Sequence, residues 1–367
     1  MPVQRMAPME SRLAPARRRV RRFMSGATPG MGWMFPSSPF DPPRRDILGE
    51  RGCARPAQRV PGRMPRGFFT QSTTVLFSQA PSIDAIEEAL APLGASITRR
   101  ETEPGWLSGG TELLVPFGES PAGTLHVDVV DQAWPDGMGH PEEAADLFGA
   151  WTMGAFGPLA FPNNLARATQ QAVAFPGAKE AVAGHGAFVR LRTSYLVGAG
   201  PDAPIMPEGW SPLAEIDAML QIVRPVLGLE GALAYFDPNA EVLLPVPLVR
   251  EVTAEGEAPP LELFTHVRLF NIDPRWALMD TVGLERCFLP DVEVLVPAGV
   301  DPNQVADFLR SITAYLLENG PVIEEGHSTE GPFGVLHVHA REEPLTEPPR
   351  QVLRLVLEGA ELPDGVL

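Results

Sequence analysis

The charge of the chain changes sign near residue 66, and this change limits which part can form one folded body. Residues 1–66 contain 14 arginines and four acids, a net charge of +10. The other 301 residues contain 15 bases and 42 acids, a net charge of −27. The first segment is rich in Arg, Pro, Gly and Met and has no hydrophobic periodicity, which favours disorder. We therefore predict a disordered basic leader over 1–66, followed by an acidic folded protein.

Two interpretations of this leader stay open. Its arginine cluster at 17–22 is typical of an arm that neutralises nucleic-acid phosphates. The other interpretation is a misassigned start, with the true start at Met64, because 28 arginines against one lysine are typical of a GC-rich genome. A twin-arginine export signal needs an apolar run after the arginines, and residues 23–30 are too short and too broken for one.

Composition also predicts the compartment and the class of partner. The chain has no run of 18 apolar residues, so we expect no membrane span. A start at Met64 leaves Cys287 as a single cysteine, which excludes an intrachain disulfide and favours a cytoplasmic bacterial protein. A net charge of −27 repels nucleic acid and anionic membranes, and it suits either solubility or a basic protein partner.

Hydrophobic patterning predicts an α+β fold. Strand patterns occur at 74–78, 111–117, 125–130, 187–196, 231–236, 241–244, 263–270, 277–282, 292–296, 335–339 and 352–357. Helices are expected after Ser82, Ser211 and Asp301, and over 164–173. Few strands are separated by a helix-length crossover, so we expect mainly antiparallel sheets with packed helices, in a rhythm that resembles ferredoxin-like halves.

The best internal linker is the acidic, proline-ended segment 251–260. It divides the folded part into an N-terminal α+β part, 67–250, and a C-terminal α+β part, 261–367. The clearest helix of the second part begins at Pro302, and its expected core-facing stripe is Val305, Phe308 and Ile312 with Tyr315 or Leu316.

The segment 148–158 is the most unusual for a binding site, because it has three glycines and three aromatic rings among eleven residues. Glycines beside Trp and Phe let the backbone approach a flat ligand closely, and Trp151 and Met153 are the candidate binding residues of this segment. The segment has neither a phosphate-binding loop nor a dinucleotide fingerprint. An aromatic loop packed over a sheet is the structural alternative.

Further candidate residues come from polar positions on strands. His185 opens the strand that carries Arg190, and Asp280 lies upstream of Asp291 and Glu293, which share one strand face. Ion pairs with the acidic excess, or solvated strand faces, are the structural alternatives at these positions, and we favour them. His337 and His339 also share a face, but no third ligand stands at a diagnostic spacing, so we predict no metal and no cofactor.

Several runs of the sequence resemble one family. They are 134–139, 148–154, 168–171, 185–192, 231–236, the run Trp-Ala-Leu-Met-Asp-Thr-Val-Gly-Leu at 276–284, 290–293 and 315–317. Together they resemble the domain-of-unknown-function family numbered 4261, a group of uncharacterised bacterial proteins, from about residue 74 onward. The resemblance implies no activity and brings no catalytic residues.

These observations favour a protein that acts by binding a protein partner, which its acidity suggests is basic. An immunity or accessory role is one form of this function. The alternative is an enzyme or small-ligand binder that uses the segment 148–158 with His185 and Asp280. A deep pocket lined by Trp151, His185 and Asp280 would favour this alternative.

Overall fold

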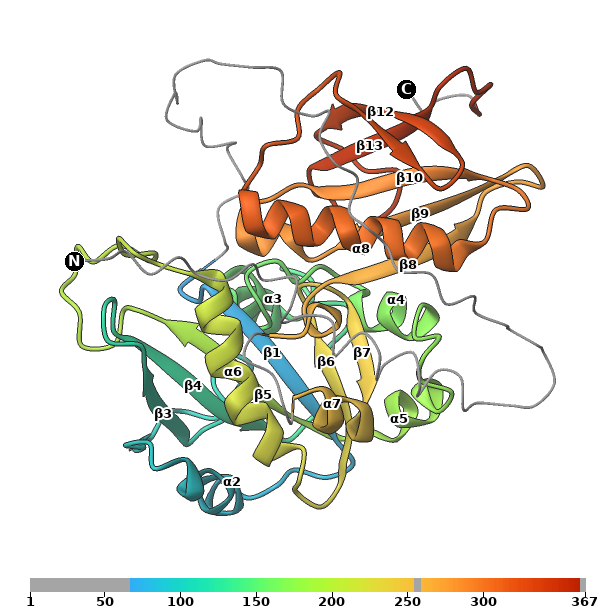
Figure 1. The fold of residues 1–367 in the computed structure, drawn as a ribbon. Helices are drawn as coiled ribbons and strands as arrows, with labels where there is room; N and C mark the ends of the chain where they lie inside the picture. Colours follow the sequence, from blue (N-terminus) through green and yellow to red (C-terminus); the bar gives the residue numbers. More distant parts are fainter. Residues whose placement is uncertain (1–66, 254–258, 364–367) are drawn as a thin grey trace.

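A computed structural model describes residues 67–253 and 259–363, which form two sheets in succession along the chain (Figure 1). The predicted leader and part of the predicted linker, 254–258, lie outside the described residues. Both sheets are mainly antiparallel and both are covered by helices, so the predicted α+β class is confirmed. The domain bounds 67–250 and 261–367 stay a prediction, although each contains one whole sheet.

The N-terminal sheet has seven antiparallel strands in the order β2-β3-β4-β5-β1-β6-β7. They are β1 (Gln71–Phe77), β2 (Thr98–Arg100), β3 (Glu112–Phe117), β4 (Gly123–Val130), β5 (Ala187–Ser194), β6 (Ala232–Asp237) and β7 (Val242–Pro245). As the alternation in β4 predicts, Leu125 and Val127 join one apolar core, while His126 and Asp128 point to the opposite face. This sheet has more strands than the four of a β-α-β-β-α-β unit.

Two helices with the predicted caps pack on the first face of this sheet. They are α2 (Ile83–Leu90) and α6 (Pro212–Val226), and Figure 1 shows α6 lying across the strands. Ser82 Oγ accepts a hydrogen bond from Ala85 N at 3.1 Å, and Ser211 Oγ accepts one from Ala214 N at 3.3 Å. Helix α6 ends one residue after Pro225, as proline predicts. A further helix, α7 (Val246–Val252), follows β7.

The other face is covered by three short helices and an aromatic core. The helices are α3 (Ala145–Thr152), α4 (Asn164–Gln170) and α5 (Ala178–Gly184). The ring of Trp134 contacts Phe156, Phe188 and Phe236 edge to face, with centroids 5.1 to 5.5 Å apart. The sequence did not predict α3 or α5, because neither helix has a side-chain cap to mark its start.

The C-terminal sheet has the order β11-β12-β13-β10-β9-β8. Only β10 and β13 pair in parallel. The strands are β8 (His266–Asn271), β9 (Trp276–Val282), β10 (Asp291–Pro297), β11 (Ser328–Gly331), β12 (Gly334–Arg341) and β13 (Val352–Leu357). Helix α8 (Pro302–Asn319) covers one face of this sheet (Figure 1).

Helix α8 packs in a register that differs from the predicted one. Its buried residues are Val305, Leu309, Thr313 and Leu316, which lie three or four positions apart and form one line. Phe308 and Ile312 are only partly buried at the side of this line, and Tyr315 is 40% exposed. The apolar residues of α8 span a wide arc, and the sequence did not show which edge of the arc faces the sheet.

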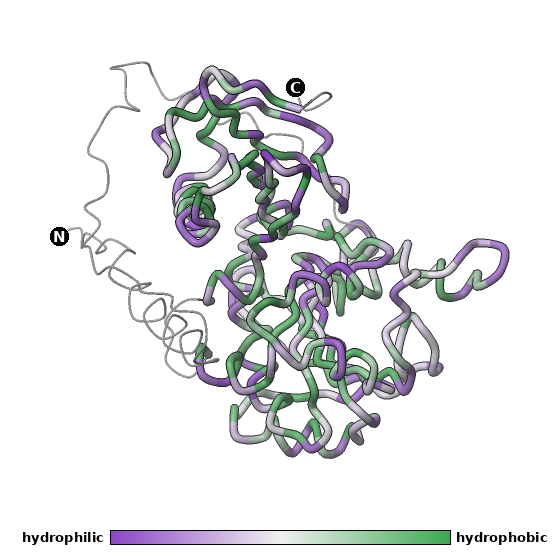
Figure 2. The backbone as a smooth tube through the Cα atoms, turned by 90° about the vertical axis from the view of Figure 1, so that its right-hand side faces the viewer, coloured by the Kyte–Doolittle hydropathy of each residue, from purple (hydrophilic) through white to green (hydrophobic). Residues whose placement is uncertain are grey.

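A short 3-10 helix of the C-terminal half, η3 (Leu284–Cys287), holds the two halves together. The buried Arg286 donates from Nη1 to Asp237 Oδ2 at 2.7 Å and from Nη2 to the carbonyl oxygen of Ser72 at 3.2 Å. The Phe288 ring contacts Trp210 at 5.4 Å. Figure 2 shows hydrophobic segments running through the interior of both halves.

Candidate functional site

The C-terminal sheet carries a row of charged side chains on the face opposite α8. The strand register places Arg268 beside Asp280, Asp280 beside Glu293, Glu293 beside Arg354, and Arg354 beside His339. Directly paired residues in neighbouring strands share a face, so these five form one row across five strands. The four residues other than His339 are buried. The predicted candidates Asp280 and Glu293 are therefore neighbours.

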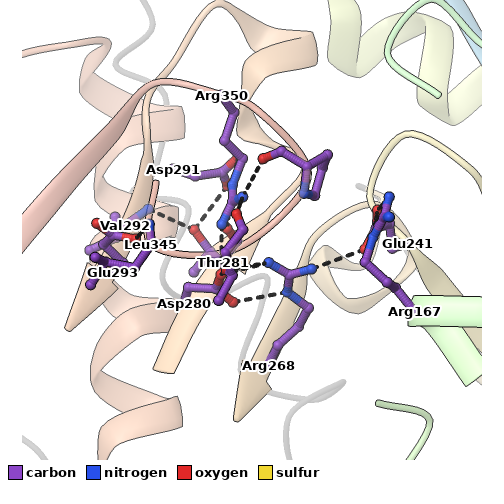
Figure 3. A network of polar contacts seen from close by, with 12 residues as sticks. Arg167, Glu241, Arg268, Asp280, Thr281, Asp291, Val292, Glu293, Leu345 and Arg350 are labelled. Carbon is purple, nitrogen blue, oxygen red and sulfur yellow. Dashed lines mark hydrogen bonds and ion pairs between the residues drawn. The ribbon is translucent and has the colours of Figure 1, made fainter. Parts of the chain in front are cut away.

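Asp280 is the centre of a network of ion pairs that reaches the N-terminal half (Figure 3). Arg268 donates from Nε to Asp280 Oδ1 at 2.9 Å and from Nη2 to Oδ2 at 2.6 Å. The same guanidinium donates from Nη1 to Glu241 Oε2 at 3.0 Å, and Glu241 also accepts from Arg167. Arg350 Nη2 donates to Asp280 Oδ2 at 2.6 Å. Burial opposes ionisation of Asp280, but Arg268 and Arg350 hold its pKa below the ordinary value.

Asp291 holds the turn that follows β9. Its Oδ1 accepts from Thr281 Oγ1 at 2.9 Å and from Leu284 N at 3.3 Å, and its Oδ2 accepts from Gly283 N at 3.3 Å. Arg350 Nε lies 3.5 Å from Oδ2. Burial raises the pKa of Asp291 to about 6 despite this arginine. The predicted candidate Asp291 therefore shares the network with Asp280, and its contacts fix the backbone.

Glu293 is covered by the segment between β12 and β13. It accepts from Arg354 Nε at 2.6 Å and from Leu345 N at 3.0 Å. In the same segment, Thr346 Oγ1 donates to Asp280 Oδ2 at 2.7 Å. The three acids predicted as a group, Asp280, Asp291 and Glu293, are each 0% exposed. Their hydrogen bonds serve the fold and the junction between the halves, and no carboxylate of the three faces solvent.

A second charged ladder lies on the N-terminal sheet around the predicted candidate Arg190. Arg190 donates to Asp128 from Nε at 3.0 Å and from Nη2 at 2.6 Å. Arg192 Nη2 lies 3.1 Å from Glu112 Oε1 and 3.2 Å from Asp128 Oδ2. Although burial opposes its ionisation, His126 and Arg192 hold the pKa of Glu112 well below its ordinary value. All five side chains are buried.

The arginines of this ladder also bind two surface loops by their carbonyl oxygens. Arg190 Nη1 donates to the carbonyl of Trp106 at 2.8 Å and to that of Ala155 at 3.0 Å. Arg192 Nη1 donates to the carbonyl of Leu107 at 2.9 Å. One buried guanidinium thus joins the loop 101–111 to the loop after α3. Bonds from charged donors are stronger than neutral ones, so both loops are held firmly.

The predicted candidate Met153 is one of three exposed apolar residues on the segments that meet at this ladder, and we call the three together the apolar patch. The patch consists of Phe68, Leu107 and Met153, which are 47%, 52% and 42% exposed. Phe68 N donates to the carbonyl of Met153 at 3.4 Å, which places the two residues side by side. The Leu107 backbone is tied to the same ladder, because its carbonyl accepts from Arg192 Nη1.

The other two candidates, Trp151 and His185, lie near the aromatic core on the same face of the N-terminal sheet. Trp151 Nε1 donates to the carbonyl of Ala160 at 2.8 Å, and the ring packs against the core. His185 Nε2 accepts from Trp134 N at 2.9 Å. Asp280 belongs to the other sheet, so the structure does not bring the three proposed pocket residues together.

A groove of about 550 Å³ opens elsewhere, between α2, α6 and the end of α7. Its walls include Leu93, Asp217, Arg224 and Arg250. None of the seven predicted site residues lines it.

Within 67–253 and 259–363, no group of three or more His, Cys, Asp or Glu side chains is arranged to hold a metal ion. His339 Nδ1 lies 3.0 Å from Glu325 Oε1, which is one pair rather than a ligand set.

Sequence reasoning missed the partners that complete these sites. Arg268 lies opposite Asp280 on an adjacent strand, and the strand alternation carried a weak signal for this pair. Arg350 comes from a loop and had no signal. Phe68 and Leu107 also had none, because an isolated exposed apolar residue is ordinary.

Comparison with known proteins identifies one segment. No curated protein and no solved structure matches the chain. The described residues contain no helix that is long and apolar enough to cross a bilayer. A family model described as Domain of unknown function (DUF4261) matches residues 280–356. This match begins at Asp280 and runs through α8 to β13. The resemblance to DUF4261 is therefore confirmed over residues 280–356.

Proposed function

We propose that this protein acts by binding a basic protein partner, without turnover. The observation that carries the proposal is the distribution of charge between interior and surface. The described residues include 39 acids and 15 bases, and burial removes eight of these acids and six of these bases. Among the described residues, 31 acids and nine bases are therefore not buried.

The remaining surface bases are also mostly neutralised. Five of the nine form ion pairs with carboxylates: Arg99, Arg100, Arg167, Arg310 and Arg341. The other four, Lys179, Arg224, Arg250 and Arg275, have no ion pair with a described residue. A surface with so few available cations attracts basic partners over long distances and repels polyanions such as nucleic acid.

The test is capture by the full chain from native bacterial lysate, followed by titration of the purified partner. We expect a basic protein whose affinity falls at least ten-fold between about 50 and 300 mM salt, because salt screens surface charges. A partner with a neutral or acidic surface, or binding that salt leaves unchanged, would contradict the proposal. Fractionation of the source cells would test the accompanying proposal of a bacterial cytoplasmic protein with an immunity or accessory role.

The alternative proposal is an enzyme or small-ligand binder that uses segment 148–158. Trp151 and His185 lie on one face of the N-terminal sheet, which supports part of this arrangement. Mass spectrometry of the native protein would detect a retained small molecule. Loss of that molecule in a His185→Ala variant, with folding intact, would favour this alternative over protein binding.

A further inference from the structure

We propose that the apolar patch of Phe68, Leu107 and Met153 is the docking surface for a basic partner segment that carries an apolar anchor residue. This inference rests on the proposed function and names its location and chemistry. The three residues are far apart in the sequence, yet hydrogen bonds join the backbones of their segments to one another or to the arginine ladder. Each exposes 42% to 52% of its surface to solvent. Interfaces are enriched in aromatic and methionine side chains at their centres, and this patch offers both.

The patch is held in place before any partner arrives. The carbonyls of Trp106 and Ala155 accept from the same Arg190 nitrogen, at 2.8 and 3.0 Å. The ring centroid of Phe69, the residue after Phe68, lies 4.3 Å from the Arg192 guanidinium carbon, and Nη1 of this guanidinium donates to the Leu107 carbonyl. A surface that is already ordered loses less conformational entropy on binding. The buried ladder therefore has a consequence at the surface, because it fixes the backbone of the segments that carry Leu107 and Met153.

The charge of the segments that carry the patch selects the partner. The patch residues lie on segments 67–69, 101–111 and 141–157, which together contain no base, and the neighbouring Arg100 is paired with Glu112. The same segments contain five exposed acids: Glu101, Glu103, Glu142, Glu143 and Asp146. A second copy of the chain would bring the same acids to a symmetric interface, and like charges facing each other are unfavourable. A basic segment with an apolar side chain complements both features.

A peptide of known sequence provides the probe. Residues 17–24 of this chain read Arg-Arg-Arg-Val-Arg-Arg-Phe-Met, which combines five arginines with apolar side chains. Binding of the fluorescently labelled peptide is measured by anisotropy. The host is the full chain with Arg17, Arg18, Arg19, Arg21 and Arg22 each changed to Ser, so that its own basic segment cannot compete. We expect Leu107→Ser and Met153→Ser to weaken binding at least ten-fold each.

Matched controls separate the patch from general charge attraction. Val322→Ser changes an apolar side chain of equal exposure, 43%, in the C-terminal half, and it should alter the affinity less than two-fold. The pair Glu103→Gln and Glu142→Gln should weaken binding about ten-fold, and the pair Glu324→Gln and Glu330→Gln less than two-fold. A peptide with Ser in place of Val, Phe and Met should bind at least ten-fold more weakly. Circular dichroism confirms that each variant is folded.

The outcomes distinguish the two proposals. If the patch variants bind the peptide as tightly as the host does, the patch is not the docking surface, and the proposed function still stands. If the host binds neither this peptide nor any basic protein, the proposed function fails and the patch proposal fails with it.

Discussion

Replacing Glu215 with glutamine should make the stability of this protein less dependent on pH. Glu215 is in the first turn of α6 and is fully buried. Its Oε1 accepts a hydrogen bond from Thr70 Oγ1, which lies 2.9 Å from Thr193 Oγ1. Burial raises the pKa of Glu215 from the ordinary value of 4.5 to about 7, and it outweighs the hydrogen bond from Thr70. The carboxyl is therefore mainly protonated in the folded protein below neutral pH.

The magnitude follows from proton linkage. A raised pKa means that the folded protein binds this proton more tightly than the unfolded chain does. The resulting stabilisation is complete below pH 4.5 and is lost as the pH rises through 7. Because one pKa unit corresponds to about 1.4 kcal/mol, raising the pKa from 4.5 to about 7 corresponds to about 3 kcal/mol. Glutamine cannot ionise, so Glu215→Gln removes this dependence on pH.

Urea unfolding of wild type and Glu215→Gln at several pH values between about 5 and 9 measures the effect. The informative quantity is the difference in free energy of unfolding between the two proteins at each pH. It should change by about 2–3 kcal/mol across this range in favour of the variant at high pH, because part of the full effect is already lost at pH 5. A constant cost of burying the amide cancels in this comparison. Glu208→Gln, at an exposed position, is the control and should run parallel to wild type. Parallel curves for Glu215→Gln as well would refute the reasoning.

Three further predictions concern the fold. Arg268→Ala leaves Asp280 and Glu241 buried with fewer partners and should cost about 3–5 kcal/mol in urea unfolding. Arg310→Ala breaks an exposed pair and should cost less than about 1 kcal/mol, and equal costs would contradict the buried network. Leu309→Ala on α8 should cost about 2–5 kcal/mol, whereas Tyr315→Ala at the exposed side should cost under about 1 kcal/mol, and the opposite order would contradict the register. A chain that begins at Met64 should melt within a few degrees of the full chain by calorimetry, and a larger loss would show that residues 1–63 stabilise the fold.

Local sequence pattern predicted most of the strands and helix caps. The expected strand 352–357 coincides with β13, and the strands expected at 231–236 and 241–244 pair as β6 and β7. Both serine caps hold where they were expected. These features depend on neighbouring residues, which the sequence shows directly. Strands β2 and β11 were missed, since β2 has three exposed residues and β11 has four with little apolar content.

Local sequence pattern did not predict the partners of the candidate residues. The sequence placed Asp280, Asp291 and Glu293 on strands, but it did not show that Arg268, Arg350 and Arg354 neutralise them. Their function could not be inferred from residue type. An exposed carboxylate can bind a ligand, whereas a buried carboxylate is usually held in an ion pair.

The sequence by itself determined the α+β class, most strands, the helix caps, the acidic character and the resemblance to DUF4261. These properties follow from short-range periodicity, capping chemistry and composition, none of which needs a tertiary partner. Only the tertiary structure decided which charges face inward and which side chains meet. The loops that carry Leu107 and Met153 meet because a buried arginine ladder ties them together. Such contacts depend on the folded path of the chain, and separation along the sequence carries no signal for them.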